Sequence, residues 1–252
     1  MEKTNKTESK MQIWLLAMRP RTLPAAAAPV IVGSAMAYYE NAFRLLPALS
    51  ALAGALLLQI GANLANDVFD YQKGADNTKR LGPTRVTQSG MLSPNEVKAG
   101  MWLTFGLAAL IGVYLTLVSG WPVVAIGLAA IAAAILYTGG PFPYGYRGLG
   151  EVFVFLFFGL AAVAGTYYVQ AVRISWSAII ASIPMGLLIV AILVVNNLRD
   201  LSTDRASGKM TLAVQLGERG TRQEYLLVVL AAYLIPLLSA LSKVNSLWML
   251  LP

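Results

Sequence analysis

The chain has 252 residues, of which 57% are hydrophobic and only 12% are charged, and its mean hydropathy is +0.64. Soluble domains average roughly 45–50% apolar and about 25% charged residues, so the composition excludes an ordinary soluble protein and indicates a membrane protein. The chain has no Cys and no His, which excludes thiolate nucleophiles, imidazole bases and metal sites built from these residues.

Apolar stretches of the length needed to cross a bilayer in a helix, ~20 residues, follow one another along the chain. The sequence predicts seven full membrane spans and the start of an eighth near residue 246. The seven predicted spans are residues 22–39, 42–65, 101–119, 121–138, 151–172, 175–197 and 225–241. We therefore expect an all-α fold, a multi-span transmembrane helical bundle in which residues 1–252 form a single domain.

The first span could also be a signal peptide, because Lys residues precede an apolar, Ala-rich run. Its length, and the six spans that follow it, favour a retained helix. Pro20 and Pro24 lie at its start, where a missing backbone N–H costs least.

The basic residues alternate between the two sides of the predicted membrane. One side carries 16 of the 19 Lys and Arg residues, namely Lys3, Lys6, Lys10, Arg19, Arg21, Lys73, Lys79, Arg80, Arg85, Lys98, Arg147, Arg199, Arg205, Lys209, Arg219 and Arg222. The other side has only Arg44, Arg173 and Lys243. Because cytoplasmic loops carry the excess of Lys and Arg, we expect the N-terminus and the loops 67–100 and 198–224 in the cytoplasm. Topology thus accounts for the net charge of +7, and no nucleic-acid partner is needed.

Acidic residues are scarce and gather in two places. Seven of the 12 lie in or beside the two long loops: Asp67, Asp70, Asp76, Glu96, Asp200, Asp204 and Glu218. A first polar face at the end of the second span, with helical spacing i, i+3, i+4 and i+7, consists of Asn63, Asn66, Asp67 and Asp70. A second face at the end of the sixth span consists of Asn197, Asp200 and Asp204. The predicted topology brings both faces to the same membrane surface.

Carboxylates that share a face repel one another unless a positive group lies between them. Mg²⁺ typically binds one or two carboxylates together with water and phosphate oxygens, so the two faces could hold a diphosphate through Mg²⁺. The basic residues available for the remaining phosphate charge are Lys73, Arg80, Arg85, Arg199, Arg205 and Lys209. The alternative is that the acids are ordinary polar helix ends, paired with nearby basic residues. The matching placement of the two faces favours a ligand site.

Five separated segments resemble the UbiA-type intramembrane prenyltransferases. They are RPRTLP (19–24), NDVFDYQKGAD (66–76), RVTQSG (85–90), YTGGPFPYGYRGLGE (137–151) and NNLRDLSTDRASGKMTLAVQLG (196–217). Within the family the likeness is greatest to the branch that prenylates 1,4-dihydroxy-2-naphthoate in menaquinone synthesis. The resemblance implies a helical bundle with a central cavity in a bacterial cell membrane, two Asp-rich motifs for Mg²⁺ and a polyprenyl diphosphate, and transfer to an aromatic acid with loss of diphosphate and CO₂.

The resemblance also implies roles for individual residues. Four acids are expected to be catalytic, Asp67, Asp70, Asp200 and Asp204, and these four together with Asp76 are the expected Mg²⁺ ligands. The expected substrate-binding residues are Asn63, Asn66, Lys73, Arg80, Arg85, Tyr137, Arg147, Asn197, Arg199 and Lys209. Aromatic side chains that could shield an allylic cation are Tyr137, Phe142, Tyr144, Phe153, Tyr167 and Tyr168.

Two departures from the family pattern stand out. The general pattern has a further Asp four residues after Asp70, where this chain has Gly74, and the next acid is Asp76. This spacing is similar to the naphthoate branch rather than the 4-hydroxybenzoate branch. The family is also expected to have nine helices, so the chain looks truncated at its C-terminus.

Several alternatives remain open from sequence. The acceptor could be another aromatic compound, and paired carboxylates in a multi-span bundle also occur in secondary transporters. Glu151 could cap a helix or bind a ligand. Tyr146 and Arg147, in a Gly-rich turn, could close over the site.

Overall fold

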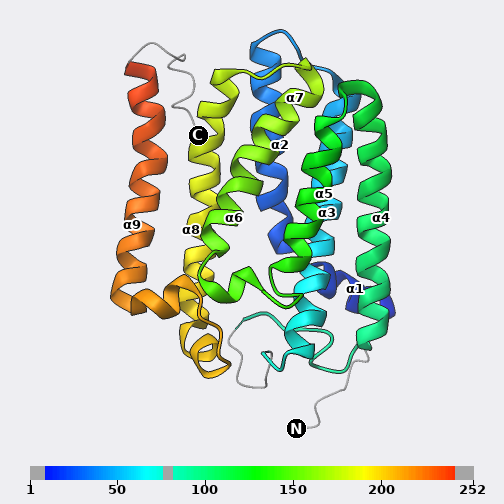
Figure 1. Cartoon of the computed structure of the whole chain (residues 1–252), viewed down its shortest axis with the longest axis vertical. Coiled ribbons are helices and arrows are strands. Elements are labelled where there is room, and N and C mark those ends of the chain that lie inside the picture. Colours follow the sequence, from blue (N-terminus) through cyan, green and yellow to red (C-terminus); the bar gives the residue numbers. More distant parts are fainter. Residues whose placement is uncertain (1–8, 76–81, 242–252) are drawn as a thin grey trace.

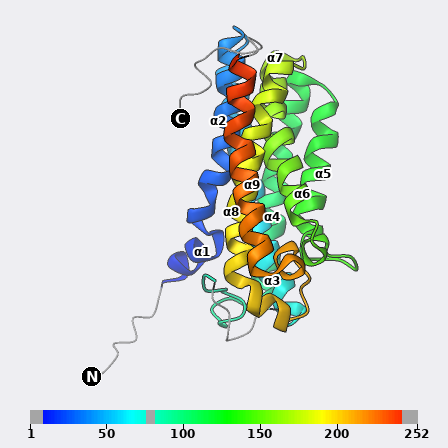
Figure 2. The ribbon, with the colours of Figure 1, turned by 90° about the vertical axis from the view of Figure 1, so that its left-hand side faces the viewer.

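The computed structural model describes residues 9–75 and 82–241, and it contains helices without strands over these ranges. The helices lie side by side as an elongated bundle (Figures 1 and 2). In chain order they are α1 (Lys10–Met18), η1 (Pro20–Thr22), α2 (Leu23–Tyr39), α3 (Leu45–Gln72), α4 (Pro94–Ser119), α5 (Pro122–Leu136), η2 (Tyr144–Arg147), α6 (Gly150–Val154), η3 (Phe155–Ala164), α7 (Gly165–Ala171), α8 (Trp176–Ala206) and α9 (Leu212–Leu241). The predicted all-α fold is confirmed.

Within the described residues, six helical segments are long and apolar enough to cross a membrane, which makes the chain a multi-pass membrane protein. They are Lys10–Tyr39, Leu45–Gln72, Pro94–Ser119, Gly150–Ala171, Trp176–Ala206 and Leu212–Ser239. The predicted span 121–138 corresponds to α5, whose 15 residues fall short of the ~20 that a crossing usually takes. The predicted count of seven full spans is therefore not confirmed. The predicted eighth span lies outside the described residues.

The first span begins earlier than its apolar run predicts, because a capped helix precedes it. Ser9 Oγ accepts a hydrogen bond from the Gln12 N–H (3.3 Å), and Gln12 Oε1 accepts one from the Ser9 N–H (2.8 Å). This reciprocal capping box fixes the start of α1. Arg19, with a positive φ of 53°, ends α1 and leads into η1.

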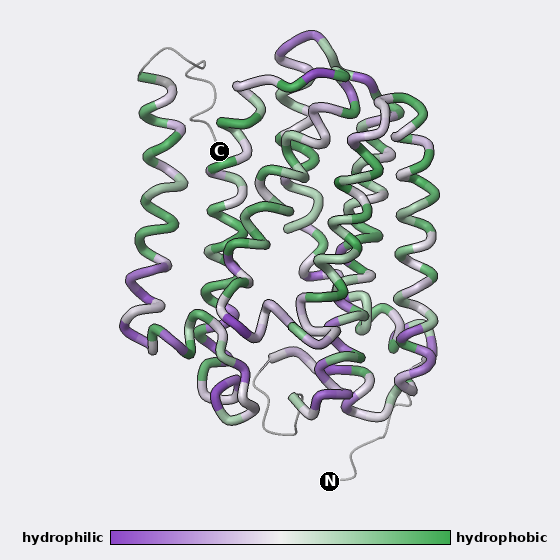
Figure 3. Tube along the Cα trace, viewed as in Figure 1, coloured by the Kyte–Doolittle hydropathy of each residue, from purple (hydrophilic) through white to green (hydrophobic). Residues whose placement is uncertain are grey.

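Hydrophilic segments gather at one end of the bundle and in some turns of the other end, and the helices between them are mostly apolar (Figure 3). We call the end that holds Gln72 of α3 and Ala206 of α8 the Asp end. The opposite end holds the turns at 40–44 and 172–175, and α3 alone covers the distance between the two ends, about 42 Å at 1.5 Å per residue. Both Asp-rich segments lie at the Asp end, as the sequence predicts, and Arg44 and Arg173 lie at the opposite end.

A π-helix, η3, packs tightly between α2 and α8 through glycines. A Cβ added to Gly159 would lie 2.8 Å from the Cα of Gly186 on α8. A Cβ added to Gly33 of α2 would lie 2.8 Å from Thr166 Cβ and would collide with the Val163 carbonyl. Small residues are the usual means by which membrane helices approach this closely.

At the opposite end, the turn after α2 is joined to the turn before α8. Glu40 Oε2 accepts hydrogen bonds from Tyr167 Oη (2.5 Å) and Arg173 Nη2 (3.2 Å), and Ser175 Oγ donates to Glu40 Oε1. Burial opposes ionisation of Glu40, but the bonds from Ser175 and Tyr167 and the charge of Arg173 together lower the pKa of this carboxyl below its usual value. We call this group the Glu40 cluster. Tyr167, predicted from sequence as a residue that could shield an allylic cation, is fully buried in this cluster, at the other end of the bundle from the Asp-rich segments.

Candidate active site

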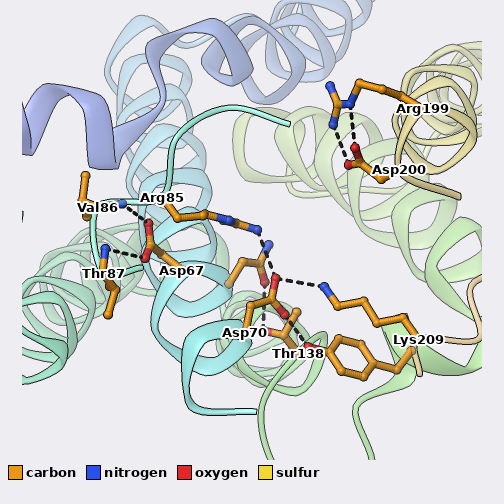
Figure 4. A network of polar contacts seen from close by, with 11 residues as sticks. Asp67, Asp70, Arg85, Val86, Thr87, Thr138, Arg199, Asp200 and Lys209 are labelled. Carbon is orange, nitrogen blue, oxygen red and sulfur yellow. Dashed lines mark hydrogen bonds and ion pairs between the residues drawn. The ribbon is translucent and has the colours of Figure 1, made fainter. Parts of the chain in front are cut away.

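The first Asp-rich segment forms the last turns of α3, and its two acids are almost completely buried. Asp67 and Asp70 are each 1% exposed. The two oxygens of Asp67 accept hydrogen bonds from the backbone N–H groups of Val86 and Thr87, both at 3.1 Å (Figure 4). Asp67 thereby holds the loop that leads from α3 to α4 against the helix end.

Asp70 lies between two buried cations. Its Oδ2 is 3.0 Å from Arg85 Nη2 and 3.1 Å from Lys209 Nζ, and its Oδ1 accepts a hydrogen bond from Tyr146 Oη at 2.5 Å. Arg85 is 4% exposed and Lys209 is 8% exposed. Two cations on one carboxylate leave an excess of positive charge in a place with little water, which suits an anionic ligand such as a diphosphate.

Tyr146 connects three segments at this point. Lys209 Nζ lies 4.7 Å and Lys73 Nζ 5.5 Å from the centroid of its ring, distances typical of cation–π contacts. Its carbonyl accepts a hydrogen bond from the Met210 N–H (2.9 Å), and Lys73 Nζ also donates to the Gly140 carbonyl (2.9 Å). Desolvation lowers the pKa of Lys73 from its usual value, and the Asp70 carboxylate opposes part of that shift.

The second Asp-rich segment forms the last turns of α8. Arg199 binds Asp200 through two hydrogen bonds, Nε to Oδ1 (2.8 Å) and Nη2 to Oδ2 (2.7 Å). Asp204 lies one turn further along, and Asn197, one turn earlier, donates from Nδ2 to Glu151 Oε1 (2.8 Å). Figure 4 shows the Arg199–Asp200 pair on α8, separate from the Asp70 group.

The asparagines of the first face bind neighbouring segments. Asn63 Nδ2 donates to the Met18 carbonyl and to Thr22 Oγ1, both at 2.9 Å. Asn66 Oδ1 accepts from Thr138 Oγ1 at 3.2 Å. The predicted face therefore has the expected helical register, but its two amides hold α3 against η1 and the end of α5.

Two neighbouring side chains of the Gly-rich turn, Tyr146 and Arg147, lie in different surroundings. Tyr146 binds Asp70. The Arg147 guanidinium instead lies 3.6 Å from the centroid of the Phe142 ring. Phe142 is 52% exposed, and its cation–π partner in this structure is Arg147; its part in shielding a substrate cation stays a prediction.

A row of aromatic rings runs from this turn into the bundle. Tyr137 and Tyr144 meet edge to face with centroids 5.3 Å apart, Tyr144 stacks on Phe153 at 4.0 Å, and Phe153 stacks on Phe157 at 6.3 Å. We call these four residues the aromatic row. Burial raises the pKa of the Tyr137 and Tyr144 hydroxyls, so both remain neutral. Phe157 was not predicted, although its i+4 spacing from Phe153 is a signal for a shared helix face.

The carboxylate oxygens at the Asp end are ligands that suit a hard divalent ion. In the ranges 9–75 and 82–241, no group of three or more acidic side chains converges on one point. Mg²⁺ in phosphate-handling sites needs only one or two carboxylates, with phosphate and water oxygens completing the shell. A carboxylate that accepts two hydrogen bonds keeps further lone pairs, so Asp67 and Asp70 retain the capacity to bind a metal.

Some predicted residues cannot be placed, and some site groups were missed. Asp76 and Arg80 lie outside the described residues. The N–H groups of Val86 and Thr87 carry no side-chain signature, so no residue pattern points to them. Glu151 lies in the first turn of α6, as capping would require, but its side chain binds Asn197 of another helix.

Comparisons with known proteins identify the family and relatives of the chain. A family model described as the UbiA prenyltransferase family matches residues 26–252. The chain is 45% identical over 212 residues to a 1,4-dihydroxy-2-naphthoate octaprenyltransferase of Mycobacterium tuberculosis, covering 84% of this chain and 72% of that protein. It is 41% identical over 251 residues to the protein of the same name from Escherichia coli, covering 97% and 82%. A solved structure of digeranylgeranylglyceryl phosphate synthase has a similar fold, with a TM-score of 0.67 at 18% identity over 94% of this chain and 80% of that one.

Proposed function

Because this chain belongs to the UbiA prenyltransferase family, we propose that it transfers the chain of a polyprenyl diphosphate to 1,4-dihydroxy-2-naphthoate at the Asp end. Relatives named for this acceptor match most of the chain at 41–45% identity, which supports the naphthoate over other aromatic acceptors. Family membership also favours an enzyme over a secondary transporter.

One observation carries the assignment of the site to the Asp end. Asp70 of α3 lies between Arg85 and Lys209, and Lys209 belongs to the turn that follows the second Asp-rich segment. This ion pair joins the two Asp-rich segments and concentrates positive charge where they meet. A diphosphate carries several negative charges and can replace Asp70 as the partner of these cations.

We assign the Mg²⁺ site to Asp67 and Asp70 of α3 with Asp200 and Asp204 of α8, and Asp76 stays a predicted fifth ligand. When bound, Mg²⁺ supplies Lewis-acid withdrawal of charge from the diphosphate. Arg85 and Lys209 then stabilise the negative charge that grows on the diphosphate oxygens as the C–O bond breaks.

The bundle supplies the dry surroundings that an allylic cation requires. Ring faces of the aromatic row can stabilise the positive charge. The acceptor carbon that bears the carboxylate forms the new C–C bond, and the electron pair of the broken C–O bond leaves with the diphosphate. CO₂ departs, and its bonding pair returns to the ring, which gives demethylmenaquinone in its reduced form. No protein nucleophile is needed, in keeping with a chain that lacks Cys and His.

The direct test incubates membranes containing the protein with Mg²⁺, a series of polyprenyl diphosphates and either 1,4-dihydroxy-2-naphthoate or 4-hydroxybenzoate. We expect a product whose mass equals the naphthoate plus the prenyl group minus CO₂, and no comparable product from 4-hydroxybenzoate. Prenylation of 4-hydroxybenzoate alone would contradict the proposed acceptor. Membranes with the Asp200→Asn protein serve as the control.

We further propose that the Asp end faces the cytoplasm, from the excess of Lys and Arg there. The chain has no Cys, so single Cys residues can be introduced and labelled cleanly. In intact cells, an impermeant thiol reagent should label Asn41→Cys, at the exposed opposite end, and should spare Ala206→Cys, at the exposed end of α8. The reverse pattern would show that the proposed orientation is inverted.

A further inference from the structure

A buried carboxylate next to the aromatic row has no role in the site described above. Glu151, at the start of α6, is 7% exposed, and its Oε1 accepts a hydrogen bond from Asn197 Nδ2 at 2.8 Å. Its Oε2 is buried and lacks a hydrogen-bond partner among the described residues. A buried charged oxygen without a donor is costly, so this atom calls for a ligand that donates a hydrogen bond.

The surroundings of Glu151 define the charge of that ligand. Glu224 of α9 lies within electrostatic range of Glu151, and its Oε2 is likewise buried without a partner in the described part of the chain. The Tyr137 hydroxyl is also close, because a Cβ added to Gly150 would lie 3.3 Å from Tyr137 Oη. Two neighbouring acidic side chains disfavour an anionic group, so this position suits neither the carboxylate of an acceptor nor a diphosphate. A neutral hydroxyl group fits.

The depth of Glu151 matches the place where an acceptor must lie. Its partner Asn197 precedes Asp200 by three residues on α8, which puts it ~4.5 Å further into the bundle. Tyr137 belongs to the aromatic row, and its hydroxyl lies within electrostatic range of Glu151. The acid therefore lies at the Tyr137 end of the row, where an aromatic ligand can stack, and one helical turn inside Asp200, which is assigned to Mg²⁺.

We infer that Glu151 recognises the aromatic acceptor through one of its hydroxyl groups, with Oε2 accepting the hydrogen bond while Oε1 remains bound to Asn197. This inference rests on the proposed function and names the residue that selects a hydroxylated ring. Glu224 adds negative charge on the same side and keeps the acceptor carboxylate pointing away from it. A site that binds a hydroxyl in this manner discriminates strongly against an analogue without one.

The test compares two competitive inhibitors of transfer to 1,4-dihydroxy-2-naphthoate. 1-Hydroxy-2-naphthoate and 4-hydroxy-2-naphthoate each retain one of its two hydroxyl groups. We expect the unmodified protein to bind the analogue that keeps the recognised hydroxyl about 10-fold or more tightly than the other, the range of a hydrogen bond to a charged group. In Glu151→Gln the amide can keep its oxygen on Asn197 and present an N–H where Oε2 stood, so the preference should fall to about 2-fold or less.

The ratio of the two inhibition constants is internal to each protein and does not depend on the amount that folds. Glu218→Gln is the matched control, because Glu218 is an exposed acid of α9 that pairs with Arg222, and we expect it to keep the full preference. Glu151→Asp retains the charge on a shorter side chain and should give an intermediate ratio; it replaces the Gln variant where the latter does not fold.

An unchanged ratio in the Glu151 variant, with transfer otherwise slowed, would overturn the inference and leave Glu151 as a structural partner of Asn197. No preference between the analogues in the unmodified protein would overturn it as well. Absence of any transfer by the unmodified protein would contradict the proposed function and this inference together, so the two failures are distinguishable.

Discussion

We expect Asp200→Asn to lower the rate of prenyl transfer by about 100-fold or more, the loss typical when a preorganised electrostatic group is removed from an active site. The amide keeps the size of the side chain but loses the charge assigned to Mg²⁺ binding. Arg199 donates to both carboxylate oxygens of Asp200. It would lose one of these two hydrogen bonds, because an Asn amide has only one oxygen. The measurement is product formed per minute at matched amounts of folded protein.

Asp67→Asn should cause a comparable loss of transfer and, in addition, a local structural change. Both Asp67 oxygens accept hydrogen bonds from backbone N–H groups, those of Val86 and Thr87. An Asn side chain would place its NH₂ group opposite one of these N–H groups, and that hydrogen bond would be lost. Faster proteolysis of the 82–92 loop in Asp67→Asn, but not in Asp200→Asn, would report this second effect. Glu218→Gln should match the unmodified protein in both assays. Normal transfer rates in both Asp variants would contradict the proposed metal site.

We expect removal of Mg²⁺ to abolish transfer, because only side chains such as Arg85 and Lys209 would then stabilise the charge on the departing diphosphate. Membranes treated with EDTA should form no detectable product, and added Mg²⁺ should restore the original rate. Ca²⁺ prefers six to eight oxygens at longer distances, so it should restore much less.

The control for chelation is the thermal stability of the protein, measured with and without EDTA. EDTA should leave the thermal stability of the protein nearly unchanged, since Asp67 and Asp70 are paired with chain groups in the structure described above. Full transfer in EDTA-treated membranes, with no response to Mg²⁺, would refute the role assigned to the four acids.

The main features of the fold could be predicted because apolar length and charge placement are local properties of a membrane chain. The spans 42–65 and 175–197 begin within three residues of the starts of α3 and α8 and cover the N-terminal parts of these helices. Their ends were underestimated because helices continue as polar turns beyond the apolar run, as at Gln72 and Ala206. The π-helix η3 packs closely against Gly33 and Gly186, and such contacts between distant segments have no local signature in the sequence.

The candidate site was predictable in its residue types but not in its pairings. Spacing along a helix places Asp67 and Asp70 together, and the structure puts both at the Asp end as expected. Spacing cannot tell that Asp67 binds backbone groups whereas Asp70 binds Lys209, since these partners come from other segments. Aromatic residues were the least predictable, because Tyr167 and Phe153 look alike in sequence and lie at different depths and ends of the bundle.

The Glu40 cluster has a consequence for how the protein is made. Glu40 and Ser175 are separated by 135 positions in the chain, and synthesis proceeds at about 5–20 residues per second, so roughly 7 to 27 s pass between the emergence of the two partners. During that interval Glu40 lacks the groups that later bind it. The early helices must therefore persist as an intermediate without the Glu40 contacts, accessible to membrane proteases and insertion factors, until the turn before α8 has been synthesised. Only then can the Glu40 cluster form.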